Sequence, residues 1–343
     1  MPNRDILAIG TSAGGVDALR FLASELPGDF PASIMVVIHL SAQFESALDA
    51  ILTQAGPLPA RFAHDRVKLE HGQIYIAPPN SHMLADGGEL RLGQGPRENN
   101  SRPSIDPMFR SLALCCGPRA IGAVLTGTLG DGASGLHTLH EYGGLTVVQD
   151  PGDAAYAGMP EAALTKFEPD HVASLAGMPS LFQRLVCEPQ GLSGGLSGAE
   201  ASPDLVYEVE LARGRIGSMS KMDEIGRRSL LACPDCHGVM WEIQEGNLLR
   251  YRCHVGHAYT AELMSLALDE NLQRALASGM RALDERVALA GKLHKQAEDA
   301  GRPLLAESWR RKRVEYEQEA DVLRSSIRRF DQLAARAVQG GGT

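Results

Sequence analysis

Short apolar runs alternate with amphipathic segments through the first half of the chain. The runs stop at glycine, proline or polar residues, which is typical of buried parallel strands, and the segments between them repeat apolar residues at helical spacing. The predicted strands are residues 6–9, 34–38, 73–77, 120–125 and 145–149, with a short edge strand at 89–92. The predicted helices are residues 16–26, 44–54, 107–116 and 133–142. This alternation predicts an α/β fold with a doubly wound, mainly parallel sheet over residues 1–187.

The second half of the chain has a different pattern. Residues 188–222 begin with glycine and serine repeats that offer no side chains for a core, so they predict a flexible linker and a domain boundary. Residues 223–260 hold clustered cysteines between strand-like runs and predict a small separate module. Residues 261–343 show a helical pattern broken once, at 300–303, which predicts an antiparallel helical hairpin. The apolar seam of this hairpin can pair with itself or with the helix of a partner.

Composition excludes several classes of function. The formal net charge of the 343 residues is −9, which argues against nucleic-acid binding because phosphate needs a basic surface. No apolar run approaches the roughly 18 residues of a membrane span, and no basic segment leads into a long apolar one, so we expect neither a membrane helix nor a signal peptide. Three of the six cysteines lie in one group, which indicates metal binding and a reducing, cytoplasmic setting.

The first predicted strand ends in a turn of small residues that holds a serine. Residues 10–15 read Gly-Thr-Ser-Ala-Gly-Gly. Gly10 and Gly14 allow positive φ angles or the close approach of another group. The helix that follows points its free N–H groups and its positive dipole end at the turn, which favours an anion or a developing oxyanion. We therefore interpret Ser12 as a nucleophile.

Two other interpretations of this turn are possible, an ordinary tight turn and the phosphate loop of a nucleotide-binding domain. The dinucleotide fingerprint requires glycine at position 12 and an acid at the end of the next strand, where this chain has His39. The elbow of α/β hydrolases shares the pattern G-x-S-x-G, but in those enzymes the acid precedes the histidine. The order here is serine, histidine, acid.

Ser12, His39 and Asp131 each follow a predicted strand. The carboxyl ends of parallel strands share one edge of a sheet, so the three side chains can meet there as nucleophile, base and orienting acid. We expect Nδ1–H of His39 to face Asp131 and Nε2 to face Ser12. The alternative is that the histidine is a packed residue and the aspartate a turn or helix-capping residue.

Several separated motifs resemble the catalytic domain of the chemotaxis methylesterase CheB, over about residues 4–187. They are Gly10-Thr11-Ser12-Ala13-Gly14-Gly15, Val37-Ile38-His39, Ile74-Tyr75-Ile76-Ala77-Pro78 with His82-Met83, Arg102-Pro103-Ser104-Ile105-Asp106, Leu125-Thr126-Gly127 with Asp131-Gly132, and Gly158-Met159-Pro160. That family hydrolyses glutamate γ-methyl esters on chemoreceptors, releases methanol and deamidates certain receptor glutamines. The resemblance implies a methylated chemoreceptor-like protein as partner and no cofactor for catalysis.

The resemblance also implies roles for individual residues. Ser12 is the nucleophile, His39 the base and Asp131 the orienting acid. Thr11 and His82 lie at the site, and the amide of Thr128 contributes to the oxyanion hole. Residues 127–132 depart from the usual family sequence, but a backbone donor does not depend on its side chain. The sequence begins at the esterase strand, so we expect a form without the receiver domain that typical members carry.

A second set of residues has the spacing of a metal site. Cys233-x-x-Cys236 is followed after sixteen residues by Cys253-x-x-x-His257, which predicts a structural Cys₃His zinc site in a zinc-ribbon-like module with a β-hairpin. Four protein ligands leave no open position, so we expect no catalytic role for the metal and expect residues 1–187 to suffice for esterase activity. The alternatives are ligation by His237 or His254 and metal-free cysteines in a small core.

The sequence therefore predicts a serine hydrolase that demethylates glutamate γ-methyl esters in chemotaxis or related signalling. One alternative is a non-catalytic signalling adaptor that keeps the fold, against which the intact Ser12, His39 and Asp131 argue. Another is a small-molecule carboxylesterase, which would turn over a small ester but not a methylated receptor.

Overall fold

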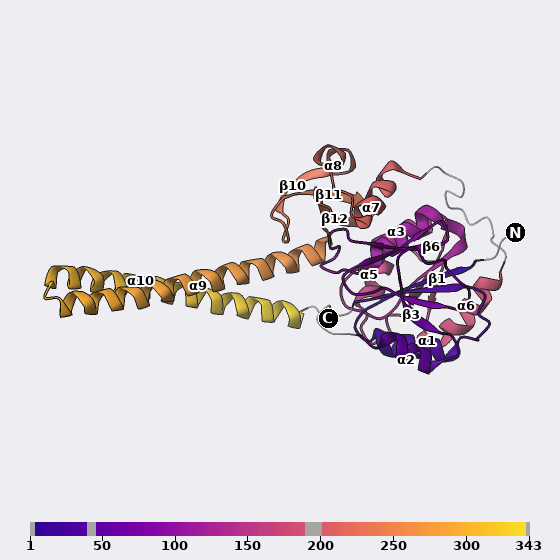
Figure 1. The fold of residues 1–343 in the computed structure, drawn as a ribbon, viewed down its shortest axis with the longest axis horizontal. Coiled ribbons are helices and arrows are strands. Elements are labelled where there is room, and N and C mark those ends of the chain that lie inside the picture. The colour runs from indigo at the N-terminus through magenta and orange to yellow at the C-terminus, as the bar shows by residue number, and fades with distance from the viewer. Residues whose placement is uncertain (1–3, 40–45, 189–200, 341–343) are drawn as a thin grey trace. The chain divides into compact units, whose positions relative to one another are not determined.

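A seven-stranded parallel sheet forms the centre of the first part of the chain (Figure 1). The computed structural model describes residues 4–39, 46–188 and 201–340. Neighbouring strands follow the order β3-β4-β2-β1-β7-β8-β9, and every pairing between them is parallel. The strands are β1 (Ile6–Thr11), β2 (Ser33–Ile38), β3 (Ala60–Phe62), β4 (Ile74–Ile76), β7 (Ala120–Val124), β8 (Leu145–Gln149) and β9 (His171–Ala173).

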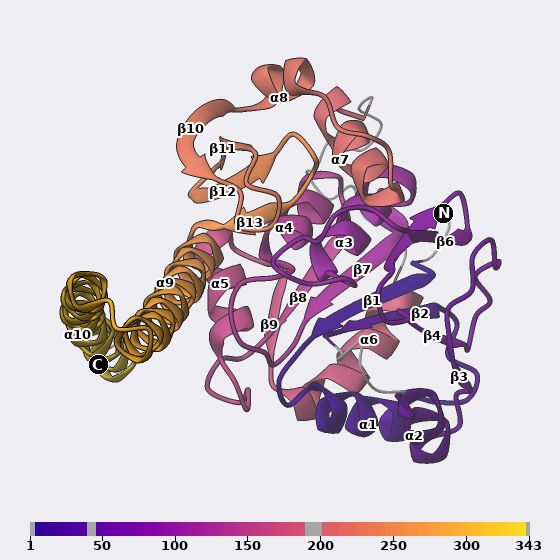
Figure 2. The ribbon, with the colours of Figure 1, turned by 60° about the vertical axis from the view of Figure 1, so that its left-hand side comes forward.

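Helices cover both faces of this sheet, as Figure 2 shows. Leu7 and Ile9 of β1 share one core with the helices α1, α2 and α6, whereas Ile6 and Ala8 share the other with α3, α4 and α5. Alternate side chains of a strand point to opposite faces of the sheet, so β1 contributes to both cores. Because helices cover both faces of a parallel sheet, the predicted doubly wound α/β fold is confirmed. The helices are α1 (Gly15–Glu25), α2 (Leu48–Ala55), α3 (Ile105–Cys115), α4 (Ala133–Glu141), α5 (Gly158–Lys166), α6 (Met178–Cys187) and the short η1 (Gly117–Arg119) and η2 (Leu175–Gly177).

β1 lies between β2 and β7, and the register brings three strand ends to one edge. Thr11 pairs with Ile38, and Gly10 pairs with Val124. A Cβ added to Gly10 would collide with the Ile105 side chain. The expected close approach at this glycine is therefore confirmed, and it places the start of α3 against the end of β1.

The predicted edge strand at residues 89–92 is present as β6 (Glu89–Gly93), but it lies outside the main sheet. It pairs antiparallel with β5 (His82–Asp86) in a separate two-stranded sheet. The N–H of Ala85 donates to Oγ of Ser111 at 2.9 Å, which attaches this small sheet to α3.

The prediction of a flexible linker over residues 188–222 is wrong for much of the described part. Residues 189–200 lie outside the described residues, and beyond them α7 (Pro203–Arg213) and α8 (Met219–Ile225) are helices. Leu205 of α7 is buried in the core that α3 shares. Ser202 caps the start of α7, and Gly214 ends it with a φ of 105°. Both helix signals, the serine cap and the terminating glycine, are present in the sequence. They follow a glycine-rich stretch that by itself predicts a linker.

The cysteine-containing module is a four-stranded antiparallel sheet. The predicted hairpin is confirmed, because β11 pairs with β12 from Met240–Cys253 to Glu245–Leu248. Trp241 is fully buried and packs in a small core with Met222 and Ile243. The strands are β10 (Arg227–Ala232), β11 (Val239–Glu245), β12 (Leu248–Cys253) and β13 (Ala258–Thr260).

Buried charges join this module to α3, and we call this set the seam network. Arg252 lies 3.0 Å from one carboxylate oxygen of Glu98, and Arg110 lies 2.6 Å from the other. Glu208 of α7 lies 3.0 Å from Arg110. The same carboxylate lies 2.9 Å from Arg250 and 3.1 Å from Arg252. Each of these five side chains is at most 8% exposed, and buried charges are costly unless paired, so the seam network holds β12 and α7 against α3.

The last two helices form a compact unit, residues 265–343, and we describe it by itself. α9 (Ala261–Asp299) and α10 (Pro303–Gly340) are joined by a turn in which Gly301 has a φ of 66°. Arg324 lies 2.9 Å from Asp284, and His294 donates to Ala306 O, so the helices run antiparallel and the predicted hairpin is confirmed. Within the described residues, no helix is both long and apolar enough to cross a membrane.

We expect Glu208→Gln to lower the free energy of unfolding by about 3–5 kcal/mol, because it leaves three buried arginines without their shared counter-charge. The matched control is Glu224→Gln on α8, which removes an exposed ion pair with Lys221 and is expected to change little. Denaturant unfolding followed by circular dichroism measures both variants. Equal changes in the two would contradict a stabilising role for the seam network.

Candidate active site

Ser12, His39 and Asp131 form a continuous chain of hydrogen bonds at the carboxyl edge of the sheet. Nδ1 of His39 lies 3.2 Å from Oγ of Ser12, and Nε2 of His39 lies 2.7 Å from Oδ2 of Asp131. The structure therefore brings together the three residues selected from the sequence. The side chain of His39 is 22% exposed and that of Asp131 only 2%, so the chain runs from a buried acid to an accessible imidazole.

The imidazole of His39 is oriented opposite to our prediction, which had Nδ1 facing Asp131. Thr11 of β1 pairs with Ile38 of β2, and Ser12 and His39 directly follow these two residues. Ser12 is therefore close to the backbone of His39, and the nearer ring nitrogen, Nδ1, reaches it. The distal Nε2 reaches past β1 to the loop that follows β7. Since a carboxylate only accepts hydrogen bonds, the neutral base carries its proton on Nε2 and offers the lone pair of Nδ1 to the serine.

The buried carboxylate of Asp131 accepts hydrogen bonds from the start of α3. Oγ of Ser104 and the N–H of Ile105 each donate at 2.7 Å, and Nδ2 of Asn99 donates at 2.8 Å. The acid thus lies at a helix N-terminus, where free N–H groups and the helix dipole favour negative charge. Burial by itself raises the pKa of Asp131, but His39 and these donors lower it to about 2, so the acid is ionised at neutral pH.

A second buried carboxylate, Asp106, lies beside Asp131. Asn99 donates one amide hydrogen to each of them at 2.8 Å and so bridges the pair. The N–H of Gly135 also donates to Asp106, and Arg110 lies 3.8 Å away. Burial, followed by the charge of Asp131, raises the pKa of Asp106. Of the two acids, Asp131 is therefore the one that stays ionised and faces His39.

Two residues that hold the acid, Asn99 and Ser104, are not among the candidates predicted from the sequence. Ser104 carried a signal, because a serine before Ile105-Asp106-Pro107 is a helix N-cap pattern, and a helix N-terminus binds anions. The sequence offers no comparable signal for Asn99, because this residue lies in an irregular loop and its partners are distant in sequence.

Thr11 and His82 lie behind the site, contrary to the expectation that they line it. Both are fully buried. Oγ1 of Thr11 donates to Thr126 O at 2.7 Å. Nε2 of His82 donates to Pro96 O at 2.9 Å, Nδ1 accepts the N–H of Ser104 at 3.3 Å, and burial lowers the pKa of this histidine. Because their polar groups are already bonded to the backbone, these residues support the site and do not face a substrate.

Thr128 lies on an exposed part of the loop next to Ser12. A Cβ added to the preceding Gly127 would lie 3.0 Å from Cβ of Ser12 and would collide with Met159, so the glycine permits this close approach. Among the described residues, the N–H of Thr128 meets no hydrogen-bond acceptor. This amide is therefore unpaired among the described residues, and it belongs to the residue after the glycine that meets Ser12.

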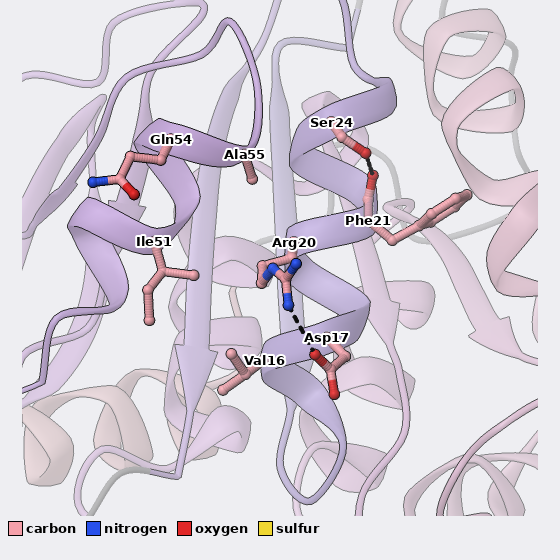
Figure 3. A pocket seen from close by; sticks show the side chains of 8 residues that line it. All are labelled: Val16, Asp17, Arg20, Phe21, Ser24, Ile51, Gln54 and Ala55. Atoms are coloured by element: carbon pink, nitrogen blue, oxygen red, sulfur yellow. Dashed lines mark hydrogen bonds and ion pairs between the residues drawn. The ribbon is translucent and has the colours of Figure 1, made fainter.

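A small polar cavity of about 170 Å³ opens beside the imidazole, and we call it the His39 cavity. Its walls include His39, Arg97 and Asn100. A larger groove of about 790 Å³ lies between α1 and α2 (Figure 3). There Arg20 already pairs with Asp17 at 3.3 Å, and the lining residues include no histidine or cysteine. The His39 cavity, unlike this groove, is lined by a residue of the hydrogen-bond chain.

Four metal-ligand side chains meet at one end of the module. They are Cys233, Cys236, Cys253 and His257, whose ligand atoms all lie within 4.8 Å of one another. Cys236 Sγ lies 3.7 Å from Cys253 Sγ, and Nδ1 of His257 lies 3.5 Å from Cys253 Sγ. A tetrahedral zinc with Zn–S bonds of about 2.3 Å places two sulfurs about 3.8 Å apart, so the group fits this ion. The alternative ligands His237 and His254 are not part of the group.

The ring orientation predicts where the neutral His39 carries its proton. We expect the proton on Nε2, because the ionised Asp131 accepts a hydrogen bond only from a protonated nitrogen. ¹⁵N NMR of histidine-labelled protein distinguishes the two ring nitrogens, and the His39→Gln variant identifies the signals. His82, whose Nε2 donates to Pro96 O, is the internal reference. A proton on Nδ1 of His39 would contradict the observed geometry.

Comparison with known proteins relates the first part of the chain to one family. The family model described as CheB methylesterase matches residues 7–182. A Leptospira interrogans protein, named provisionally as a protein-glutamate methylesterase/protein-glutamine glutaminase, is 37% identical over 184 residues, which are 53% of this chain and 95% of that protein. Protein-glutamate methylesterase/protein-glutamine glutaminase 3 of Anaeromyxobacter dehalogenans is 38% identical over 165 residues, which are 48% of each protein.

A solved structure agrees with these relatives. The crystal structure of the Thermotoga maritima CheB methylesterase catalytic domain matches with a TM-score of 0.51 and 29% sequence identity, over 54% of this chain and 100% of that chain. The fold, the family model and the relatives thus confirm the resemblance drawn from the sequence motifs. This chain belongs to the CheB methylesterase family.

Proposed function

We propose that this chain is a serine hydrolase that removes the methyl group from glutamate γ-methyl esters of a chemoreceptor-like protein and releases methanol. The hydrogen-bond chain from Asp131 through His39 to Ser12 carries the proposal, because it supplies acid, base and nucleophile in one place. Family membership supports an ester as the substrate group. The names of the relatives support glutamate as its carrier and glutamine deamidation as a second reaction of the same site.

In the first half-reaction, Oγ of Ser12 attacks the ester carbonyl carbon, and its proton passes to Nδ1 of His39. Asp131 stabilises the imidazolium through the Nε2–H bond. The free N–H of Thr128 donates to the oxyanion. The carbonyl C–O bond to the methoxy group then breaks, and His39 gives its proton to the leaving oxygen, which leaves methanol and an acyl-serine.

In the second half-reaction, water replaces methanol. Nδ1 of His39 takes a proton from the water as its oxygen attacks the acyl carbon. Collapse of the second tetrahedral intermediate breaks the bond to Oγ of Ser12, and His39 returns the proton to the serine. The products are a free glutamate and the original enzyme. A glutamine substrate follows the same path, with ammonia as the leaving group.

The His39 cavity is the proposed place for the substrate side chain. Its volume of about 170 Å³ is below the roughly 300–1,000 Å³ typical of small-molecule pockets, so it suits one side chain of a protein. Arg97 and Asn100 make its wall polar, which suits an ester presented from a protein surface. Size and polarity therefore favour a receptor substrate over a small-molecule carboxylesterase.

The Cys/His group is the proposed site of a structural zinc. Its four ligands leave no open coordination position, and no bond of the proposed serine chemistry forms at the metal. Asp235 lies 3.9 Å from Nε2 of His257, in the place of the carboxylate that commonly orients a metal-bound imidazole. On the hairpin, Leu289 and Val322 are more than half exposed, which supports its proposed pairing with itself or with a partner helix.

Ser12→Ala tests the nucleophile. We expect turnover of a methylated receptor fragment to fall on the order of 10⁶-fold, because no other group forms the acyl intermediate. The double variant Ser12→Ala/His39→Ala is expected to be scarcely slower, since the residues act as a unit. Methanol release measures the rate, and circular dichroism confirms folding.

The control for this experiment is Ser24→Ala, which removes an exposed hydroxyl on α1 that donates to Phe21 O at 2.8 Å. We expect its rate to equal that of the wild type. A folded Ser12→Ala protein that keeps a tenth of the wild-type rate would contradict the proposal. Hydrolysis of a small chromogenic ester without any release from the receptor would favour a small-molecule esterase, and inactivity on both would favour an adaptor.

Metal analysis tests the zinc site. We expect about one zinc per purified chain, and we expect Cys236→Ser to lose it, because three remaining ligands cannot close the tetrahedron. Cys187→Ser is the matched control, since this exposed cysteine lies outside the group. Retention of zinc by Cys236→Ser, or equal loss in both variants, would show that the ligands are other residues.

A further inference from the structure

Asn99 links the acid of the triad to the Cys/His module. Its side-chain NH₂ donates to Asp131 and to Asp106, both at 2.8 Å. Its side-chain oxygen accepts the N–H of Thr260 at 3.2 Å, and its own N–H donates to Ala258 O at 2.8 Å. The residue is only 7% exposed. Asn99 therefore bonds to the acid pair through its side-chain NH₂, and to strand β13 through its side-chain oxygen and its backbone N–H.

β13 completes the hydrogen bonds of the Asn99 amide. Both NH₂ hydrogens face carboxylates, so the amide oxygen points the other way, where the N–H of Thr260 meets it. If the amide were flipped, its oxygen would face the two carboxylates, and no hydrogen bond could form there because both sides are acceptors. Asn99 also has a φ of 51°, and its bond to Ala258 helps to hold this left-handed backbone.

β13 is held in turn by the Cys/His group and the seam network. Ala258 directly follows His257, and the N–H of Cys253 donates to His257 O at 3.0 Å, which closes the turn that carries two of the four ligands. Arg252 pairs with Ala258 across β12 and β13 and lies 3.0 Å from Glu98, the residue before the asparagine. The start of β13 therefore follows directly on the turn that carries two of the four ligands.

We propose that Asn99 is a positioning residue for ester hydrolysis and that the zinc-loaded module holds it in place. In the loaded protein, Asn99 orients Asp131, Asp131 orients the ring of His39, and Nδ1 meets Ser12. Loss of zinc loosens β13, so Thr260 no longer holds the amide and the acid loses a donor. This inference rests on the proposed hydrolase function, and it differs from the expectation that residues 1–187 suffice for esterase activity, which stays a prediction.

Asn99→Ala tests the link to the acid. We expect kcat for a small chromogenic ester to fall on the order of 10- to 100-fold with KM unchanged, because a hydrogen bond to a charged group is lost without any substrate contact. The matched control is Asn247→Ala, which removes an exposed amide at the turn between β11 and β12. An unchanged kcat in folded Asn99→Ala, or an equal fall in both variants, would overturn the proposal.

Zinc removal tests the link to the module. Chelation of the full-length wild type is expected to lower kcat to the level of Asn99→Ala, and added zinc is expected to restore it. In Asn99→Ala, where the link is already broken, chelation is expected to change kcat less than about twofold. Amide hydrogen exchange at Thr260 is expected to become faster on chelation in the wild type. An unchanged kcat, or the same fold-change in both proteins, would overturn the coupling.

The Ser12→Ala variant separates this inference from the proposed function. If Ser12→Ala keeps its rate, the hydrolase role of the site fails. If Ser12→Ala is inactive while Asn99→Ala and zinc removal leave kcat unchanged, only the positioning role fails.

Discussion

An ionised carboxylate buried beneath the active site is the constraint on which the rest of this structure depends. Asp131 is 2% exposed, so fixed hydrogen-bond donors must replace the water that solvates an exposed carboxylate. The donors are the N-terminus of α3, the amide of Asn99 and the imidazole of His39. Gly10 lacks a Cβ, so α3 can approach β1 closely enough to serve this purpose. The negative charge that this arrangement keeps lies 2.7 Å from Nε2 of His39, the ring whose other nitrogen meets Ser12.

The three catalytic candidates were predictable because each follows a strand. Apolar runs mark the ends of β1, β2 and β7, and parallel strands bring those ends to one edge. The orientation of the His39 ring was not predictable, because it depends on which ring nitrogen the neighbouring backbone brings to Ser12. Thr11 and His82 were expected at the site, but their burial and backbone hydrogen bonds follow from side-chain packing, which no motif encodes.

The attachment of the module was not predictable for a different reason. Arg250 and Arg252 alternate with apolar residues in β12, a pattern typical of a strand with one solvent-facing side. Their partners, Glu98 and Glu208, lie far away in sequence, and long-range ion pairs produce no local periodicity. The four candidate metal ligands were easier to select, because their spacing on either side of one hairpin is itself the signal.

The position of β13 along the chain also affects the time at which the site is completed during synthesis. At about 5–20 residues per second, a ribosome reaches Thr260 roughly 4 to 16 seconds after residue 182, the last residue of the family domain. During this interval Glu98 has Arg110 but not Arg252, and the side-chain oxygen of Asn99 has no strand to meet. The nascent chain therefore carries Asp131 with its donors from Ser104 and Ile105 before it carries the strand that meets Asn99. Translation thus supplies the contacts of β13 after all the other contacts of the acid.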